Sequence, residues 1–150
     1  MDLNRVIYEA SPVDRFATLF YGIFDPVSRA FTYVNAGHNP PTLLRAATGE
    51  VVHLAEGGLM IGGFRSARYQ QGSVTLVTGH TMVIFTDGIT EAGNAAVEEF
   101  GEKRIIDIVQ AGAGLPATGL VQRILRAVEL FTRGAGQHDD ITLVVVRITA

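Results

Sequence analysis

The chain has 150 residues, of which 47% are hydrophobic and 18% are charged, so it is long enough to bury the core of one globular domain. Its net charge of −3, without a basic cluster, argues against a nucleic-acid partner, and the absence of cysteine excludes disulfides and thiolate zinc sites. No apolar run approaches the ~18 residues of a membrane span, and the first residues lack the apolar stretch of a signal peptide, so we expect a cytoplasmic protein.

The N-terminal part of the chain predicts a short helix followed by a β-hairpin. Apolar residues recur with helical spacing over residues 2–10, and Pro12 ends that pattern. Residues 17–24 are apolar on both faces, which is typical of a central strand. A turn at 25–28 leads to a returning strand at 30–35, because proline presets φ and aspartate caps its own backbone.

Two more antiparallel pairs are predicted in the middle of the chain. Residues 42–45 and 50–54 flank an Ala-Ala-Thr-Gly turn, and residues 73–77 and 81–85 flank a Thr-Gly-His turn. The glycine-rich segment 57–63 lies between the two pairs. It lacks the lysine and the strand-to-helix context of a phosphate-binding loop, so we interpret it as a structural crossing.

The C-terminal part changes to helical periodicity. Residues 102–111 and 120–131 each place apolar side chains on one stripe, which predicts two amphipathic helices. A Gly-Ala-Gly break at 134–136 ends the second helix, and residues 141–148 predict a strong central strand. Strands, then two helices, then a last strand indicate an α+β fold with antiparallel sheet.

Acidic residues stand at the ends of two predicted strands. Asp87 follows the buried stretch 83–86, and the pair Asp139-Asp140 precedes the last strand. In antiparallel neighbours, the end of one strand lies beside the start of the other. If these two strands are neighbours, three carboxylates meet at one edge of the sheet.

Three interpretations of these carboxylates remain open. Asp-Gly and Asp-Asp sequences commonly form turns. Clustered carboxylates also repel one another, and a hard cation such as Mg²⁺ or Mn²⁺, which prefers oxygen ligands, relieves that repulsion. A paired general acid and base is the third interpretation, and it is weaker because the chain has no tryptophan to form a sugar platform.

Histidine and serine residues add little to these interpretations. His38, within Ala36-Gly37-His38-Asn39-Pro40, is typical of a hydrogen-bonded loop histidine rather than of a catalyst. His138, beside Asp139, is either a ligand or, more commonly in such a place, a solvent-facing loop residue. No serine lies in a G-x-S-x-G elbow, so a serine nucleophile has little support.

Several short motifs occur along the chain in one particular order. They are TLFYG at 18–22, YVNAGHNPP at 33–41, FTDGITEA at 85–92, FG at 100–101 and DDIT at 139–142. Each motif is weak alone, but together and in this order they are specific. From about Asn4 to its end, the chain resembles the C-terminal part of the SpoIIE/RsbU-type bacterial serine phosphatases, a branch of the PPM (type 2C) metal-dependent protein phosphatases.

This resemblance implies an α-β-β-α sandwich of two antiparallel sheets. It also implies a pair of Mn²⁺ or Mg²⁺ ions that activate water for attack on phosphoserine or phosphothreonine. Carried over by position, Asp87 and Asp139 match metal-ligating aspartates. Gly88 would permit close backbone approach, and Asp140 would lie beside the ligands. His38 belongs to the N-A-G-H turn, whose role is structural first, and it would lie beside the ligands or on the substrate side.

The sequence departs from the family at its start. Relatives carry a G-D-x-x-G-x-G motif whose aspartate bridges both metals, and residues 1–150 contain no such motif. We therefore expect a single partial domain, N-terminally truncated, that holds at most one ion weakly and has little or no activity. A missing strand would expose a sheet edge, so we also expect homodimers, and we expect a sensor domain upstream in the full-length protein.

Two functions of different classes follow from these expectations. The first is a Mn- or Mg-dependent protein serine/threonine phosphatase that acts in signal transduction on a phosphorylated regulatory protein, such as an anti-anti-sigma factor. The alternative is a noncatalytic, phosphatase-like module that binds a partner. A sugar-processing enzyme with a carboxylate pair is a distant third.

Overall fold

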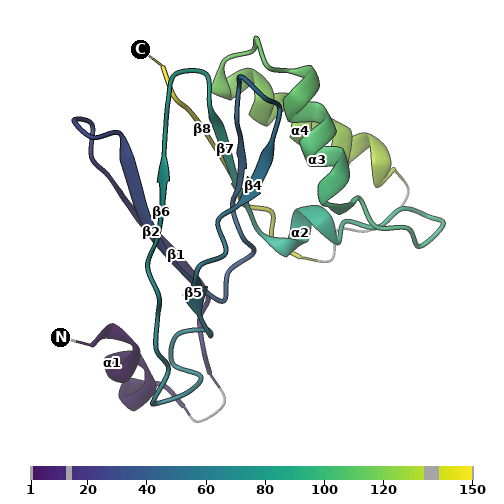
Figure 1. Cartoon of the computed structure of the whole chain (residues 1–150). Helices are drawn as coiled ribbons and strands as arrows, with labels where there is room; N and C mark the ends of the chain where they lie inside the picture. Colours follow the sequence, from purple (N-terminus) through teal and green to yellow (C-terminus); the bar gives the residue numbers. More distant parts are fainter. Residues whose placement is uncertain (1, 13–14, 134–138, 150) are drawn as a thin grey trace. The chain divides into compact units, whose positions relative to one another are not determined.

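The computed structural model describes residues 2–12, 15–133 and 139–149. The chain forms two compact units, each assembled from separate stretches of sequence (Figure 1). Unit 1 comprises Met1–Pro40 and Leu54–Leu76, and unit 2 comprises Pro41–His53 and Val77–Ala150. Each unit carries one mainly antiparallel sheet, which confirms the predicted α+β class. The single partial domain over residues 1–150 stays a prediction.

Unit 1 begins with helix α1 (Leu3–Ala10), as its periodicity predicted, and the Asp2 side chain caps the first turn. Asn4 of this helix is buried, and its Oδ1 accepts hydrogen bonds from the Gly62 N–H at 3.0 Å and the Tyr69 hydroxyl at 3.1 Å. Sequence reasoning missed this asparagine, because its partners stand 58 and 65 residues further along the chain. Asn4 thereby ties α1 to a distant loop of unit 1.

The predicted N-terminal hairpin is confirmed. Strand β1 (Leu19–Phe24) pairs antiparallel with β2 (Ala30–Ala36). In the turn, the Asp25 carboxylate accepts hydrogen bonds from the Val27 N–H at 2.9 Å and from the Ser28 hydroxyl at 2.6 Å. The aspartate therefore caps the local backbone, as its position before proline predicted.

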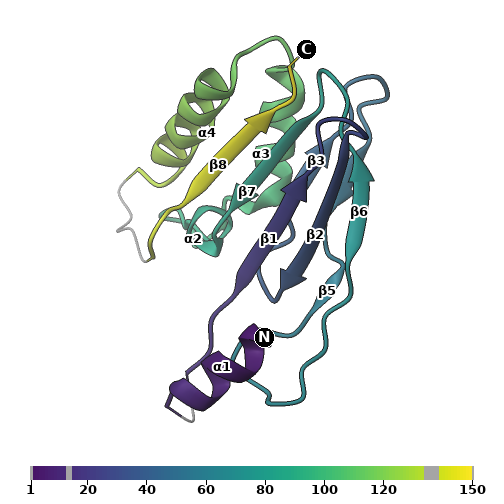
Figure 2. The ribbon, with the colours of Figure 1, turned by 90° about the vertical axis from the view of Figure 1, so that its left-hand side faces the viewer.

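Strand β2 organises the sheet of unit 1. β5 (Gly57–Gly58) runs parallel to it and β6 (Gly72–Thr75) runs antiparallel to it (Figure 2). β1 stands at the end of the strand order, so the prediction of a central strand is wrong there. The apolar character of both faces misled that prediction, because Tyr21 and Ile23 on one face are each 59% exposed.

The predicted pairing of residues 73–77 with residues 81–85 is also wrong. β6 belongs to the sheet of unit 1, whereas β7 (Thr81–Phe85) belongs to the sheet of unit 2. The connection between them does have turn character, with Gly79 at φ +91°. Strand pairing is decided by tertiary packing, which local turn residues do not encode.

The sheet of unit 2 is antiparallel and has the order β4-β3-β7-β8. β3 (Thr42–Leu44) and β4 (Val51–His53) form the predicted hairpin, and β7 is an interior strand as expected. β8 (Leu143–Arg147) stands at the end of the order, so the prediction of a central strand is wrong here too. The side chain of Val144 is correspondingly 45% exposed.

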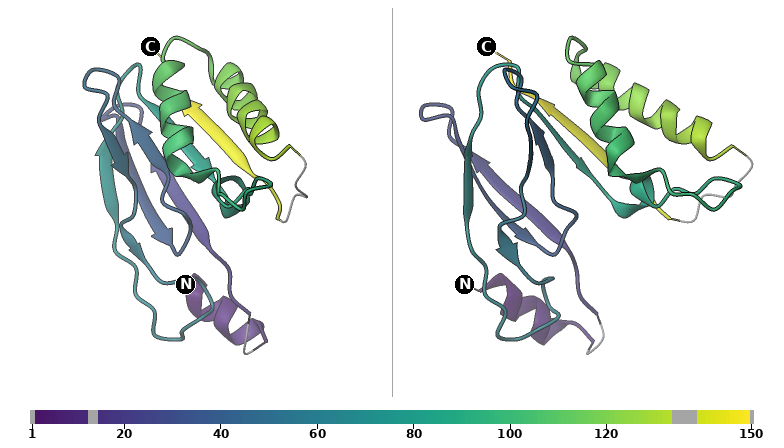
Figure 3. Two further views of the ribbon diagram at one scale, coloured as in Figure 1. Left: turned by 90° about the vertical axis from the view of Figure 1, so that its right-hand side faces the viewer. Right: turned by 45° about the vertical axis from the view of Figure 1, so that its right-hand side comes forward.

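Two helices cover one face of this sheet, α3 (Gly101–Ala111) and α4 (Ala117–Phe131), as their periodicity predicted (Figure 3). The predicted break at 134–136 lies outside the described residues. Among the described helices, none is both long and apolar enough to cross a bilayer. The core of unit 2 consists of Leu44, Val83, Phe85, Ile89, Phe100, Ile105, Val109, Ile124 and Val128.

Candidate metal centre

The end of β7 and the start of β8 lie side by side in unit 2. Their pairing runs to the last residue of β7, and the Thr86 N–H then donates to the Thr142 carbonyl at 3.1 Å. The predicted antiparallel neighbourhood of these two strands is therefore confirmed. The segments that carry Asp87 and Asp139-Asp140 leave the sheet at the same edge.

Thr86 fastens these two segments together. Its hydroxyl donates to the Asp140 carbonyl oxygen at 3.1 Å and accepts from the Thr142 N–H at 3.0 Å. A hydroxyl has both a donor and acceptor lone pairs, so one side chain makes both bonds. Sequence reasoning missed this role, because the partners stand 54 and 56 residues away in the chain.

Asp87 opens the one-turn helix α2 (Asp87–Thr90). Its backbone carbonyl accepts hydrogen bonds from the Glu91 N–H at 2.8 Å and from the Thr90 hydroxyl at 3.2 Å. The residue is exposed, and its Oδ1 accepts from the Gly88 N–H at 3.0 Å. The backbone of Asp87 thus builds a turn, while its carboxylate faces solvent.

Gly88 is buried against the second acidic segment. A Cβ at this position would lie 2.4 Å from the Asp140 carbonyl oxygen and 3.4 Å from the Asp139 carbonyl carbon. A side chain there would have to displace backbone, since real Cβ atoms do not approach so closely. Only glycine allows α2 to approach Asp139-Asp140 to this extent.

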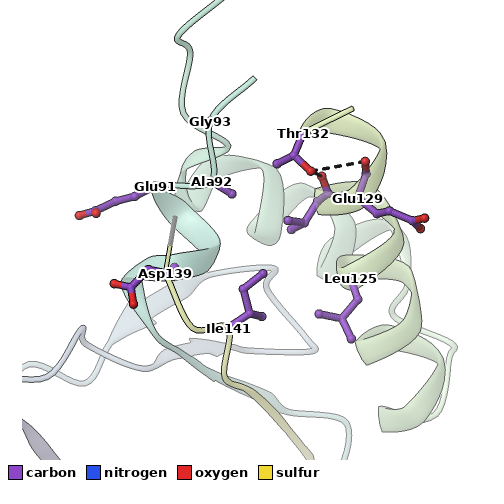
Figure 4. Close-up of a pocket in the computed structure, with 10 residues that line it drawn as sticks. Glu91, Ala92, Gly93, Leu125, Glu129, Thr132, Asp139 and Ile141 are labelled. Atoms are coloured by element: carbon purple, nitrogen blue, oxygen red, sulfur yellow. Dashed lines mark hydrogen bonds between the residues drawn. The ribbon is translucent and has the colours of Figure 1, made fainter. Parts of the chain in front are cut away.

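Asp139 and Asp140 are both exposed. The Asp140 N–H donates to Asp139 Oδ1 at 2.7 Å, which holds the first carboxylate in place. In Figure 4 the Asp139 carboxylate points away from the apolar side chain of Ile141. The structure thus brings Asp87, Gly88 and Asp139-Asp140 together where β7 ends and β8 begins, and we call this place the acidic edge.

The donors at this edge suit a hard divalent cation, because they are carboxylate oxygens. Such a cation would also offset the repulsion between the clustered negative charges. Within the part of the chain that the structure describes, no three His, Cys, Asp or Glu side chains gather as a metal site. The assignment of Asp87 and Asp139 as metal ligands stays a prediction.

His38 belongs to unit 1, in the turn that follows β2. The Asn35 side chain accepts from the His38 N–H at 2.8 Å and donates to the His38 carbonyl at 2.9 Å. Gly37 has φ +73°, and a Cβ on it would lie 2.9 Å from the Met60 nitrogen. His38 Nδ1 lies 3.4 Å from Thr18 Oγ1. These contacts order the N-A-G-H turn locally, and the place of His38 beside the ligands or on the substrate side stays a prediction.

His138, the other histidine considered as a ligand, lies outside the described residues. The glycine-rich segment 57–63 contributes β5, and a Cβ on Gly57 would lie 1.7 Å from the Asn35 carbonyl oxygen. Gly57 therefore permits close backbone packing against β2, which fits the interpretation of the segment as a structural crossing.

Comparison with known proteins points to one family. The family model described as Stage II sporulation protein E (SpoIIE) matches residues 1–149. Protein IcfG of Synechocystis sp. (strain PCC 6803) is 30% identical over 143 residues, which cover 95% of this chain and 22% of IcfG. Phosphoserine phosphatase RsbU of Bacillus subtilis (strain 168) is 29% identical over 148 residues, which cover 97% of this chain and 43% of RsbU. The chain thus spans less than half the length of either relative.

Solved structures share this fold. The RsbU and RsbW domains of Rv1364c from Mycobacterium tuberculosis align with a TM-score of 0.73 and 26% identity, over 98% of this chain and 40% of that chain. The catalytic domain of the serine/threonine protein phosphatase PstP, in complex with two manganese ions, aligns with a TM-score of 0.70 over 98% of this chain and 67% of that chain. At 18% identity, the likeness to PstP shows the fold alone.

Proposed function

Given that this chain belongs to the SpoIIE family, in the SpoIIE/RsbU branch of the PPM (type 2C) phosphatases, we propose that it forms part of a metal-dependent protein serine/threonine phosphatase. The reaction is the hydrolysis of phosphoserine or phosphothreonine in a protein. The observation that carries the proposal is the meeting of two acidic segments, at Asp87 and at Asp139-Asp140, on one sheet edge. The Thr86 hydroxyl holds these segments together.

Each residue at this edge has a separate task in the proposed reaction. Asp87 and Asp139 hold Mn²⁺ or Mg²⁺ through carboxylate oxygens, and the manganese in the PstP catalytic domain supports this kind of ion. The ion, when bound, stabilises negative charge on the phosphoryl group and lowers the pKa of water. Thr86 orients the two segments, and Gly88 allows their close approach, so both residues position the ligands.

One weakly bound ion is the most that we propose for residues 1–150. In the family, an aspartate of a G-D-x-x-G-x-G motif bridges two ions, and this sequence contains no such motif. Without the bridging carboxylate, a two-metal site lacks a shared ligand. We therefore propose little or no turnover by these residues alone.

The proposed substrate is a phosphorylated regulatory protein, such as an anti-anti-sigma factor, in the cytoplasm. RsbU, a phosphoserine phosphatase, supports a phosphoserine substrate. Because the chain covers 43% of RsbU, the activity of the whole protein and an upstream sensor domain belong to the proposal as well.

A noncatalytic, phosphatase-like module that binds a partner is the second candidate function. The observation that favours it is the partial ligand set, since the described residues gather no group of three metal-binding side chains. The two candidates differ in whether Asp87 and Asp139 bind a cation.

Calorimetric titration with Mn²⁺ separates the two candidates. The wild-type chain is expected to bind Mn²⁺, and Asp87→Asn and Asp139→Asn are each expected to weaken that binding by at least about tenfold, because each removes a charged ligand. Asp107→Asn is the matched control, since Asp107 is an exposed carboxylate on α3 that pairs with Lys103 at 2.7 Å. Identical heats from the wild type and Asp87→Asn would remove the ligand assignment and favour the module.

A further inference from the structure

A pocket of about 250 Å³ opens in unit 2 beside the candidate metal centre (Figure 4). Its apolar wall consists of Ala92 after α2, Leu125 and Val128 of α4, and Ile141 before β8. Thr132 also lines it, but the hydroxyl of this residue already donates to the Val128 carbonyl at 3.0 Å. The interior of the pocket is therefore mostly apolar.

We propose that this pocket is a specificity subsite that receives one aliphatic or aromatic side chain of the phosphoprotein substrate, from a residue close in sequence to the phosphorylated one. The inference rests on the proposed phosphatase function and adds to it a preference in the substrate sequence. The occupant is an apolar side chain that has a basic residue next to it.

The size of the pocket indicates a single side chain as its occupant. Pockets that bury small molecules or cofactors typically measure about 300–1,000 Å³. The present pocket, at about 250 Å³, is below that range. An apolar wall of this extent gains most from one buried aliphatic or aromatic group.

Leu125 supplies the second observation. The helical periodicity of α4 places it on the same apolar stripe as Ile124 and Val128, which are 0% and 4% exposed. Leu125 is nevertheless 40% exposed, and in Figure 4 its side chain and that of Ile141 border the same space. Because Leu125 lines the pocket beside Gly88 and Asp139, its open apolar surface can be buried by a side chain that enters there.

The pocket is continuous with the candidate metal centre. Gly88 and Asp139 line the pocket and also form part of the acidic edge. A residue close in sequence to a phosphoserine bound at this edge can therefore reach the pocket. This shared wall is the reason to assign the pocket to the substrate rather than to an unrelated ligand.

Charged residues at the rim of the pocket determine which substrate residue is preferred beside the inserted side chain. Glu91 and Glu129 both line the pocket, and Figure 4 shows their carboxylates pointing away from its interior. Glu129 is paired with Arg126 at 2.6 Å, so its charge is largely compensated. The Glu91 charge favours a basic residue beside the inserted side chain and disfavours an acidic one.

The test uses methyl NMR spectra of the whole chain in the presence of Mg²⁺. The probes are phosphoserine peptides that carry a Leu-Arg pair at successive positions on either side of the phosphoserine, and matched peptides with Ala-Arg. For at least one position, the Leu-Arg peptide is expected to shift the methyl signals of Leu125 and Ile141 and to bind roughly tenfold more tightly than its Ala-Arg partner.

Two leucine variants on the same helix provide the control. Leu125→Gln is expected to abolish the preference for the Leu-Arg peptide, while Leu130→Gln keeps it, because Leu130 is 43% exposed and does not line this pocket. Both variants are expected to keep the response of the Gly88 and Asp139 amide signals to Mg²⁺.

The outcomes separate this inference from the proposed function. If the amide signals respond to Mg²⁺ but no peptide shifts the methyl signals of the pocket, the pocket is no subsite and the metal assignment stands. The same conclusion follows if Leu125→Gln and Leu130→Gln show the same preference for the Leu-Arg peptide. If the amide signals of the wild type respond to neither Mg²⁺ nor Mn²⁺, the proposed function is contradicted, whatever the peptides do.

Discussion

Single residues at the acidic edge could be predicted from the sequence only in part. Asp87 and Asp139 stand out because one follows and the other precedes an apolar strand, each within a recognisable motif, and their role as ligands stays a prediction. The role of Thr86 cannot, because its hydroxyl bonds to partners 54 and 56 residues away. The exposure of Leu125 was also unforeseen, because helical periodicity alone places that side chain in the core.

Gly88→Ala tests the close approach of α2 to Asp140. A Cβ 2.4 Å from the Asp140 carbonyl oxygen forces the backbone apart, so the substitution should lower the free energy of unfolding by about 1–3 kcal/mol and weaken Mn²⁺ binding. Gly114→Ala is the control, because no atom lies within 4 Å of the place that its methyl group would take, and it should change stability by less than about 0.5 kcal/mol. Equal urea midpoints for Gly88→Ala and Gly114→Ala would show that α2 does not approach Asp140 as closely as described.

At the scale of elements, periodicity predicted the helices, and turn chemistry predicted two hairpins. α3 and α4 each bury one apolar stripe, which a sequence shows directly, whereas in α1 the buried residue is Asn4 and the apolar residues Leu3 and Val6 are exposed. The pairing of β6 and the positions of β1 and β8 at the ends of their sheets could not be predicted, because apolar residues on both faces of a strand do not say where it lies in the sheet. For the same reason, the sequence did not show that β6 and β7 belong to different sheets.

The connection from β6 to β7 makes stability depend on pH. His80 is buried there, its Nδ1 accepts from the Val77 N–H at 3.5 Å, and burial, with a smaller effect of Arg45, lowers its pKa below the ordinary 6.5. Because the pKa is lower in the folded than in the unfolded state, stability is full above about pH 6.5 and is lost as pH falls through the folded pKa.

Urea midpoints measured between about pH 7 and pH 5 test this dependence. The urea midpoint of His80→Gln should fall less over that pH range than the midpoint of the wild type, because the glutamine side chain takes up no proton. If the urea midpoint of His80→Gln changed with pH as steeply as that of the wild type, the assignment of this dependence to His80 would be contradicted.

At the scale of the whole molecule, family membership rests on motifs from both compact units. The N-A-G-H turn lies in unit 1, whereas the T-D-G and D-D motifs lie in unit 2. Their order along the chain was visible in the sequence, and the SpoIIE family model spans residues 1–149. The chain covers 22% of IcfG and 43% of RsbU, so the activity of those whole proteins comes to this chain only as a proposal.

Self-association through β1 is the prediction at this scale. β1 stands at the end of its sheet, and Tyr21 and Ile23 are each 59% exposed, so a second copy can pair with this edge. Light scattering at high concentration should give a dimer mass for the wild type and a lower mass for Ile23→Lys. Val144→Lys, at a 45% exposed position of β8, should remain dimeric. A monomeric wild type would count against the proposal.

The convergence of Asp87 and Asp139 on one cation is tested most directly by anomalous diffraction from crystals of this chain soaked in Mn²⁺. The account predicts one manganese peak within coordination distance of both carboxylates, at roughly 2.0–2.2 Å from their oxygens. Crystals of Asp87→Asn should lack it. A wild-type crystal in which the two carboxylates face apart, with no peak between them, would contradict the account.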